Sequence, residues 1–208
     1  MTPAAWASVA AICALGAASP GPSLALVVRH SLSGSRALGV ACALAHAMGV
    51  GVHALLTAAG LAAVLVAHPG LYRLLAVAGA LYLAWLAWGI LRQPGAHTPS
   101  AGPGGAGIGA AMRDGFLMAL LNPKIAVFFL ALFSQFVSPD SDAFDMAVLW
   151  ATATAIDGAW YSLVAVGLTG SRWLDGLRSH GAVVERVTGV LLLGLAAWTL
   201  GQAALGGG

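Results

Sequence analysis

Two charged residues stand in the middle of long apolar runs. Lys124 lies in "LLNPKIAVFFL" and Asp157 lies in "ATATAIDGAW". If lipid surrounds these runs, each charge costs roughly 2.5–3.5 kcal/mol, so such residues usually serve a purpose. One interpretation is an ion pair in which Lys124 and Asp157 neutralise each other. The other is that Asp157 binds a substrate amine, carries a proton, or does both.

Two histidines share a third apolar run. His46 and His53 are seven residues apart, so on a helix they lie on one face. Histidine can shuttle protons near neutral pH, which makes His46 a candidate for proton coupling beside Asp157. Either histidine could instead be a core residue that is hydrogen-bonded to a neighbouring helix. A metal site would need further ligands, and none stands at a helpful spacing, so we expect neither a metal nor a cofactor.

The composition indicates that lipid is the solvent. The chain is 60% hydrophobic and 8% charged, whereas a soluble domain usually carries about 25% charged residues. The net charge of +2 is small, and no basic cluster suggests a nucleic-acid partner. Cys13 and Cys42 both lie in apolar segments and are expected to be small core residues.

Six apolar runs are long enough to span a bilayer, which takes roughly 20 residues in a helix. They cover about 4–28, 37–67, 70–91, 112–137, 145–170 and 182–204. We therefore expect an all-α integral membrane protein with six transmembrane helices. The Gly/Pro-rich segment 93–111 is expected to be a flexible cytoplasmic loop between two domains, 1–92 and 112–208.

The basic residues predict the orientation. The connections between spans one and two, three and four, and five and six hold or border Arg29, Arg36, Arg92, Arg113, Arg172, Arg178 and Arg186. The opposite side has Arg73 and the acidic turn at 138–145. The positive-inside rule then places both termini on the periplasmic side.

The two halves resemble each other at one unusual feature. "ASPGPSLALVV" in the first span and "LLNPKIAVFFL" in the fourth each contain a Ser-Pro or Asn-Pro step. Three spans per half would place the halves in opposite orientations. The sequence therefore predicts two inverted three-helix repeats, a plan used by many secondary transporters.

Each Pro step predicts a break in its helix. Proline lacks an N–H and clashes with the carbonyl four residues earlier, so Pro123 would free the carbonyl of Ala119. Ser19 and Asn122 would act as N-caps, with Pro20 and Pro123 as the first helical residues. Helices one and four would then each restart near the middle of the membrane.

Helix N-termini at mid-membrane would form an anion site. Their unpaired N–H groups and positive dipole ends attract negative charge, and Lys124 adds a full positive charge beside one of them. A substrate carboxylate is the expected guest. The predicted substrate-binding residues are Ser19, Pro20, Gly21, Pro22, Ser23, Asn122, Pro123, Lys124 and Asp157.

Three long segments of the chain resemble one family. "ASPGPSLALV", "SGSRALGVACALAHAMGVGVHALLTAAGLAAVL" and "RDGFLMALLNPKIAVFFLALFSQFV" are similar to the lysine exporter (LysE/RhtB) family of amino-acid exporters. The resemblance covers nearly the whole chain. It implies proton-driven efflux of amino acids or close derivatives across the bacterial inner membrane. It also implies family motif roles for Pro20, Gly21, Pro22, Asn122, Pro123 and Lys124, and Asp157 sits where such exporters often carry an acid in span five.

The chain departs from the family pattern at three places. Ser23 stands where the family usually has asparagine, and His46 stands where a glycine is common. "FSQF" at 133–136 replaces the usual Leu-Pro-Gln-Phe. These changes alter the expected cavity, so the substrate is not inherited from any one member.

We therefore expect a secondary active exporter with amino-acid-like substrates, protons and the lipid bilayer as its partners. The alternative is a metal-ion exporter of the same architecture, which would need His46, His53 and Asp157 to converge. An intramembrane enzyme with a His/Asp pair lacks a nucleophile in this reading, so we expect no enzymatic activity. Faces of small residues would permit a homodimer, although packing within one chain explains them equally well.

Overall fold

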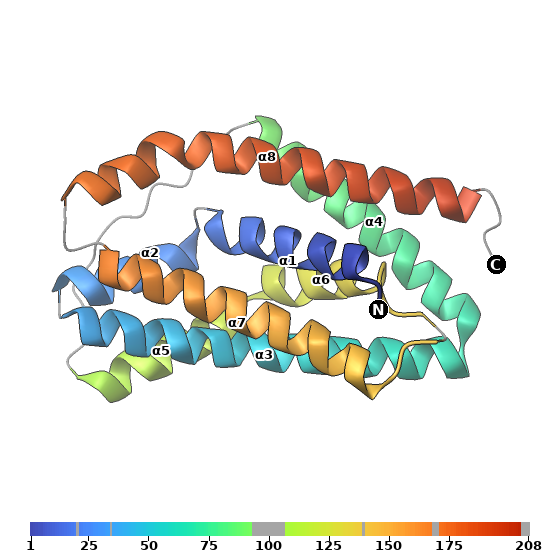
Figure 1. Ribbon diagram of the computed structural model, residues 1–208, viewed down its shortest axis with the longest axis horizontal. Coiled ribbons are helices and arrows are strands. Elements are labelled where there is room, and N and C mark those ends of the chain that lie inside the picture. The colour runs from blue at the N-terminus through green and yellow to red at the C-terminus, as the bar shows by residue number, and fades with distance from the viewer. Residues whose placement is uncertain (20, 34, 93–106, 139, 168–170, 205–208) are drawn as a thin grey trace.

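The computed structural model describes residues 1–19, 21–33, 35–92, 107–138, 140–167 and 171–204, and within these ranges it is all-helical (Figure 1). The eight helices of this described part are α1 Pro3–Ala18, α2 Pro22–Ser33, α3 Arg36–Ala67, α4 Pro69–Arg92, α5 Ile108–Leu120, α6 Pro123–Phe133, α7 Ala143–Gly167 and α8 Ser171–Ala204. Most of the predicted connection 93–111 lies outside the described residues.

Two pairs of helices correspond to interrupted apolar runs. α1 and α2 meet at a 59° bend, and α5 and α6 meet at a 54° bend. Judged by length and hydropathy alone, one described helix can cross a bilayer, over Arg36–Leu61. The number rises to at most three if each bent pair is counted as a single span. Shorter apolar stretches occupy Arg73–Gly89 in α4 and Arg186–Gly201 in α8.

Both interruptions lie at the predicted proline motifs, but one half-helix begins later than expected. α6 begins at Pro123 with Asn122 as its N-cap, as predicted. α2 begins at Pro22, and Ser19 is the C-cap of α1 and not the N-cap of α2. The reason is that the residue before a proline disfavours the helical conformation, so Gly21 cannot open the helix.

The helices pack in layers around α1 and α6. α3 lies along both α5 and α7, while α4 lies along α8. α1 contacts α7 and α8, and α6 contacts α3 and α4, so each short helix packs against two longer ones (Figure 1). α1 buries one face, with Val9, Ile12 and Cys13, and leaves the opposite face exposed. Their apolar side chains fill the main core, including Val9 and Ile12 from α1 and Phe129, Leu132 and Phe133 from α6.

The contact between α3 and α5 is unusually close. A Cβ atom added at Gly115 would overlap the backbone carbonyl of Cys42, and one at Gly49 would meet the Phe116 carbonyl oxygen at 2.9 Å. Only glycine permits this approach, because any side chain would force the two backbones apart. The glycines thereby bring α5 against the face of α3 that carries the two histidines.

Candidate functional site

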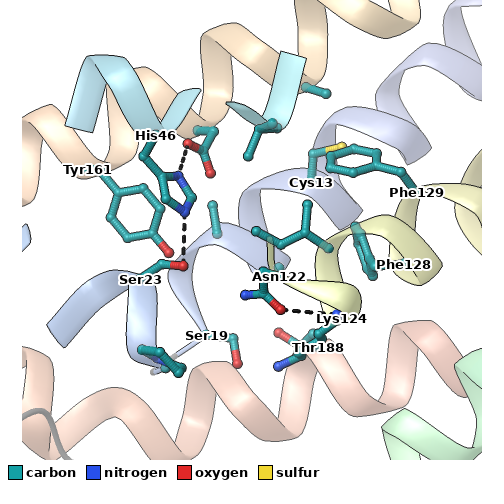
Figure 2. A pocket seen from close by; sticks show the side chains of 18 of the residues that line it. Cys13, Ser19, Ser23, His46, Asn122, Lys124, Phe128, Phe129, Tyr161 and Thr188 are labelled. Carbon is teal, nitrogen blue, oxygen red and sulfur yellow. Dashed lines mark hydrogen bonds and ion pairs between the residues drawn. The ribbon is translucent and has the colours of Figure 1, made fainter. Parts of the chain in front are cut away.

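A cavity of about 110 Å³ lies where the two interrupted helices meet (Figure 2). From the first interruption it is lined by Ser19, Gly21, Pro22 and Ser23. From the start of α6 it is lined by Asn122 and Lys124. Two segments about one hundred residues apart in sequence, each containing one of the proline motifs, therefore line one cavity.

Two further predicted residues reach the same cavity from the long helices. His46 on α3 and Asp157 on α7 both line it. Pro20 lies outside the described residues, and of Pro123 only the backbone, as the first residue of α6, is described. Every other predicted substrate-binding residue is a lining residue of this cavity.

His46 links Ser23 to Asp157 in a buried hydrogen-bonded chain. Its Nδ1 lies 2.8 Å from Asp157 Oδ2, and its Nε2 lies 2.9 Å from Ser23 Oγ (Figure 2). The three residues are between 1% and 8% exposed. Because the ring joins a carboxylate and a hydroxyl, it can hold a proton at one nitrogen and exchange it at the other.

Tyr161 completes this cluster and was not identified from the sequence. Its ring packs edge-on against His46 with centroids 5.0 Å apart, and its hydroxyl points toward Ser23 (Figure 2). The residue is 4% exposed. One signal was available, since Tyr161 follows Asp157 by four residues and so lies on the same face of α7.

Asp157 has a close buried partner on another helix. Its carboxylate lies against His46 of α3, so its charge is not balanced by Lys124 alone. His46 and Ser23, two of the positions that depart from the family pattern, are in direct contact.

The start of α6 is built as a capped half-helix. Asn122 Oδ1 accepts a hydrogen bond from the Lys124 backbone N–H at 3.0 Å. In an uninterrupted helix that N–H would bond to the carbonyl of Leu120. The cap therefore removes the usual donor from Leu120 and fixes the first turn of α6 beside the cavity.

His53 supplies a replacement donor for that carbonyl. Its Nε2 lies 3.0 Å from the Leu120 carbonyl oxygen. Pro123 has no N–H for the carbonyl of Ala119, and that oxygen instead accepts from the Asn122 backbone N–H at 3.2 Å. Both carbonyls at the end of α5 that lose their usual helical donors therefore have other partners.

The two histidines thus have different partners. His46 bonds to Asp157 and Ser23, whereas His53 bonds to a backbone carbonyl. No group of three or more His, Cys, Asp or Glu side chains comes together in the described part of the chain. The convergence that a metal-ion exporter would require is therefore not found there.

One side of the cavity is apolar. Cys13 from α1 and Phe128 and Phe129 from α6 lie across from Tyr161, His46 and Ser23 (Figure 2). Phe128 and Phe129 pack edge to face with centroids 5.5 Å apart. Phe129 packs in turn on Phe133, 5.3 Å away, which anchors the pair in the core.

A second charged cluster joins α2 to α5 away from the cavity. Asp114 Oδ2 pairs with Arg29 at 3.2 Å and lies 3.3 Å from His30 Nε2, while Asp114 Oδ1 pairs with Arg113 at 3.1 Å. Arg113 is exposed, whereas His30 is 1% exposed. The cluster ties the end of the first half-helix pair to the start of the second.

A helical fold with two interrupted helices and a polar site at the interruptions defines a class of membrane transport proteins. The chain matches the model of the LysE type translocator family over residues 14–202 and belongs to that family. It is 28% identical over 186 residues to a leucine efflux protein of Enterobacter sp. (strain 638), covering 86% of each chain. It is 30% identical over 151 residues to a threonine efflux protein of Salmonella typhi, covering 71% of this chain and 73% of the relative. No solved structure gives a significant match.

Proposed function

We propose that the protein is a proton-coupled secondary exporter of amino acids or close derivatives across the bacterial inner membrane. Family membership and relatives named for leucine and threonine efflux support amino-acid export. The observation that carries the mechanism is one cavity in which the starts of α2 and α6 face the buried His46–Asp157 pair.

The proposed architecture is six spans arranged as two inverted repeats, 1–92 and 112–208, with both termini periplasmic. α1–α2, α3 and α4 would correspond to α5–α6, α7 and α8. If the two halves are exchanged, α3 takes the place of α7 and α4 the place of α8, so the α3–α7 and α4–α8 pairs are unchanged. The same exchange turns the α3–α5 contact into the α1–α7 contact. The α1–α7 contact occurs, and the α3–α6 contact likewise has its counterpart in α2–α7, which supports the repeat. Among the described helices the α2–α3 and α4–α6 contacts have no counterpart of similar extent in α6–α7 and α2–α8, so the two halves are not packed identically.

The substrate carboxylate binds at the two half-helix starts. The first backbone N–H groups of a helix have no partner within it and point toward negative charge. The Lys124 side chain lines the cavity beside the start of α6 and adds a full positive charge. An α-carboxylate satisfies both features at once.

The substrate amine faces Asp157, and protons compete with it there. With its carboxylate ionised, Asp157 attracts the ammonium group; once protonated, it does so no longer. His46 holds Asp157 Oδ2 at 2.8 Å and gives the proton a second site in the same chain of hydrogen bonds. A proton that arrives from the periplasmic side would therefore weaken amine binding and release the substrate outward.

Transport into inverted membrane vesicles tests this function. Vesicles that contain the protein and carry an imposed proton gradient are expected to take up amino acids, and Asp157→Asn is expected to abolish gradient-driven accumulation. Asp145→Asn, near the start of α7 and outside the cavity, is the matched control. Full proton-driven transport by Asp157→Asn would contradict the coupling role of Asp157. The absence of uptake for every amino acid would contradict the proposed function.

A further inference from the structure

The cavity has chemically unlike sides, and this bears on the substrate side chain. The inference rests on the proposed function, because it concerns the side chain of an amino acid whose carboxylate and amine are already bound. Ser23, His46 and Tyr161 form a polar side, and Cys13, Phe128 and Phe129 form the side across from it (Figure 2).

The charges in the cavity match a zwitterion with a neutral side chain. Among its described lining residues, Lys124 is the basic residue of fixed charge and Asp157 is the acidic one. An α-carboxylate and an α-amine would engage both. A further charge on the substrate side chain would then be desolvated without a counter-charge, which is strongly unfavourable.

The apolar side is a rigid surface. The Phe128 ring lies over Gly16 of α1, where a Cβ atom would meet the ring at 3.3 Å. It also packs edge to face against Phe129, which is 5% exposed and contacts Phe133. Aromatic side chains fixed in this way offer contact area to a ligand at little cost in conformational entropy.

The apolar surface continues beyond the phenylalanines. Val50 from α3, Ile125 from α6 and Leu192 from α8 also line the cavity. Hydroxyl groups of Ser19 and Thr188 lie near Lys124, at the end assigned to the carboxylate (Figure 2). A substrate side chain that extends away from the carboxylate and amine sites therefore meets carbon atoms.

We infer that the substrates are amino acids with neutral, apolar side chains, aliphatic or aromatic, and that Phe128 is a specificity-determining residue. Apolar side chains gain from burial against this surface, whereas lysine, arginine, glutamate and aspartate each add an uncompensated charge. Threonine lacks the apolar reach to cover the two rings.

Counterflow in proteoliposomes tests the inference. Liposomes that hold the purified protein and unlabelled leucine are challenged with labelled leucine, and leucine, methionine, phenylalanine, threonine, lysine and glutamate are compared as competitors. The apolar amino acids are expected to compete at least about tenfold better than the charged ones, a discrimination of the size that pocket contacts provide. Equal competition by lysine or glutamate would overturn the inference while leaving amino-acid exchange intact. Absence of exchange for all six would instead overturn the proposed function.

Substitutions of Phe128 test whether the aromatic side of the cavity causes the preference for apolar substrate side chains. Phe128→Ala is expected to reduce the preference for leucine over threonine about tenfold, and the milder Phe128→Leu, which conserves an apolar side chain, is expected to keep it. Phe144→Ala, at an exposed phenylalanine near the start of α7, is the matched control. An unchanged ranking of competitors in both Phe128 variants would remove Phe128 from the site.

Discussion

The Nε2 atom of His53 lies 3.0 Å from the backbone carbonyl oxygen of Leu120, the last residue of α5. The contact joins a side chain of α3 to the point at which a neighbouring helix is interrupted. It shows how a break inside an apolar protein can be tolerated, since the exposed carbonyl receives a partner from a neighbouring helix.

Loss of this contact is expected to destabilise the fold. In His53→Leu the Leu120 carbonyl loses its donor while it stays out of water, which costs about 1–3 kcal/mol. Thermal unfolding in detergent should show a lower midpoint, and His53→Gln, which retains a donor, should recover part of it. His68→Leu, at an exposed histidine, serves as the control. Equal midpoints for His53→Leu and the native chain would contradict the structural role of His53.

Replacing His46 should impair proton coupling more than it impairs substrate binding. His46→Gln keeps a hydrogen-bonding side chain between Ser23 and Asp157 but cannot carry a proton. We expect gradient-driven uptake to fall about tenfold or more while substrate exchange without a gradient is largely retained. The two assays on one preparation separate these effects, and a parallel loss of both would assign His46 to binding or folding instead.

Lys124 should be needed for the carboxylate in particular. A hydrogen bond to a charged group contributes about 1.5–3 kcal/mol, so Lys124→Ala is expected to weaken amino-acid binding by roughly tenfold to a hundredfold. The corresponding amino-acid amide lacks the negative charge and should bind the native protein and the variant alike. Affinities of leucine and leucinamide, measured by competition, check this. A loss of equal size for both ligands would place the carboxylate elsewhere.

Asp114 should matter more to stability than its exposed partner. Its two oxygens join Arg29 and His30 of α2 to Arg113 of α5, so Asp114→Asn leaves the partly buried Arg29 and the buried His30 without their carboxylate. We expect a loss of about 1–3 kcal/mol. Arg113→Ala removes an exposed ion pair and should cost less than about 1 kcal/mol. Thermal unfolding of the two variants makes the comparison, and the reverse order would contradict this account of the cluster.

Ser23, His46 and Asp157 have the hydrogen-bond order found in serine hydrolases, which the sequence analysis did not foresee. In the proposed exporter the serine hydroxyl serves as a hydrogen-bond partner and not as a nucleophile. A fluorophosphonate probe, which labels activated serines, is therefore expected to leave Ser23 unmodified in membranes. Labelling that disappears in Ser23→Ala would establish an enzymatic serine and contradict the expectation that the chain is not an enzyme.

Local chemistry explains why the two helix breaks could be predicted. Asn122 and Pro123 act within one helical turn, so the sequence indicates the start of α6 directly. The break after α1 was predicted in the same way, but its half-helix was expected to start at Pro20 and begins at Pro22. The spacing of His46 and His53 likewise predicted a shared face of α3. The partners of the two histidines depend on how α5 and α7 are rotated against that face. The spacing of residues within α3 alone does not determine that rotation.

The same limit explains what was missed. Pro123 indicated that Ala119 loses its usual donor, whereas the loss at Leu120 follows from the Asn122 cap and its replacement by His53 depends on the packing of α3. The hydrogen bond between Ser23 and His46 joins α2 to α3, and Tyr161 reaches both from α7. A cluster drawn from three helices becomes visible only when their packing is known.

The close approach of Gly115 to the Cys42 backbone has a consequence for any motion of the molecule. Two helices packed this closely have little room to shift against each other, so we expect the cavity to rearrange elsewhere. The 54° bend at Leu121–Asn122 lies directly after this immobile segment and directly before the half-helix that carries Lys124 and Phe128. The bend, and not the contact between α3 and α5, is therefore the place where we expect a change in the shape of the cavity to begin.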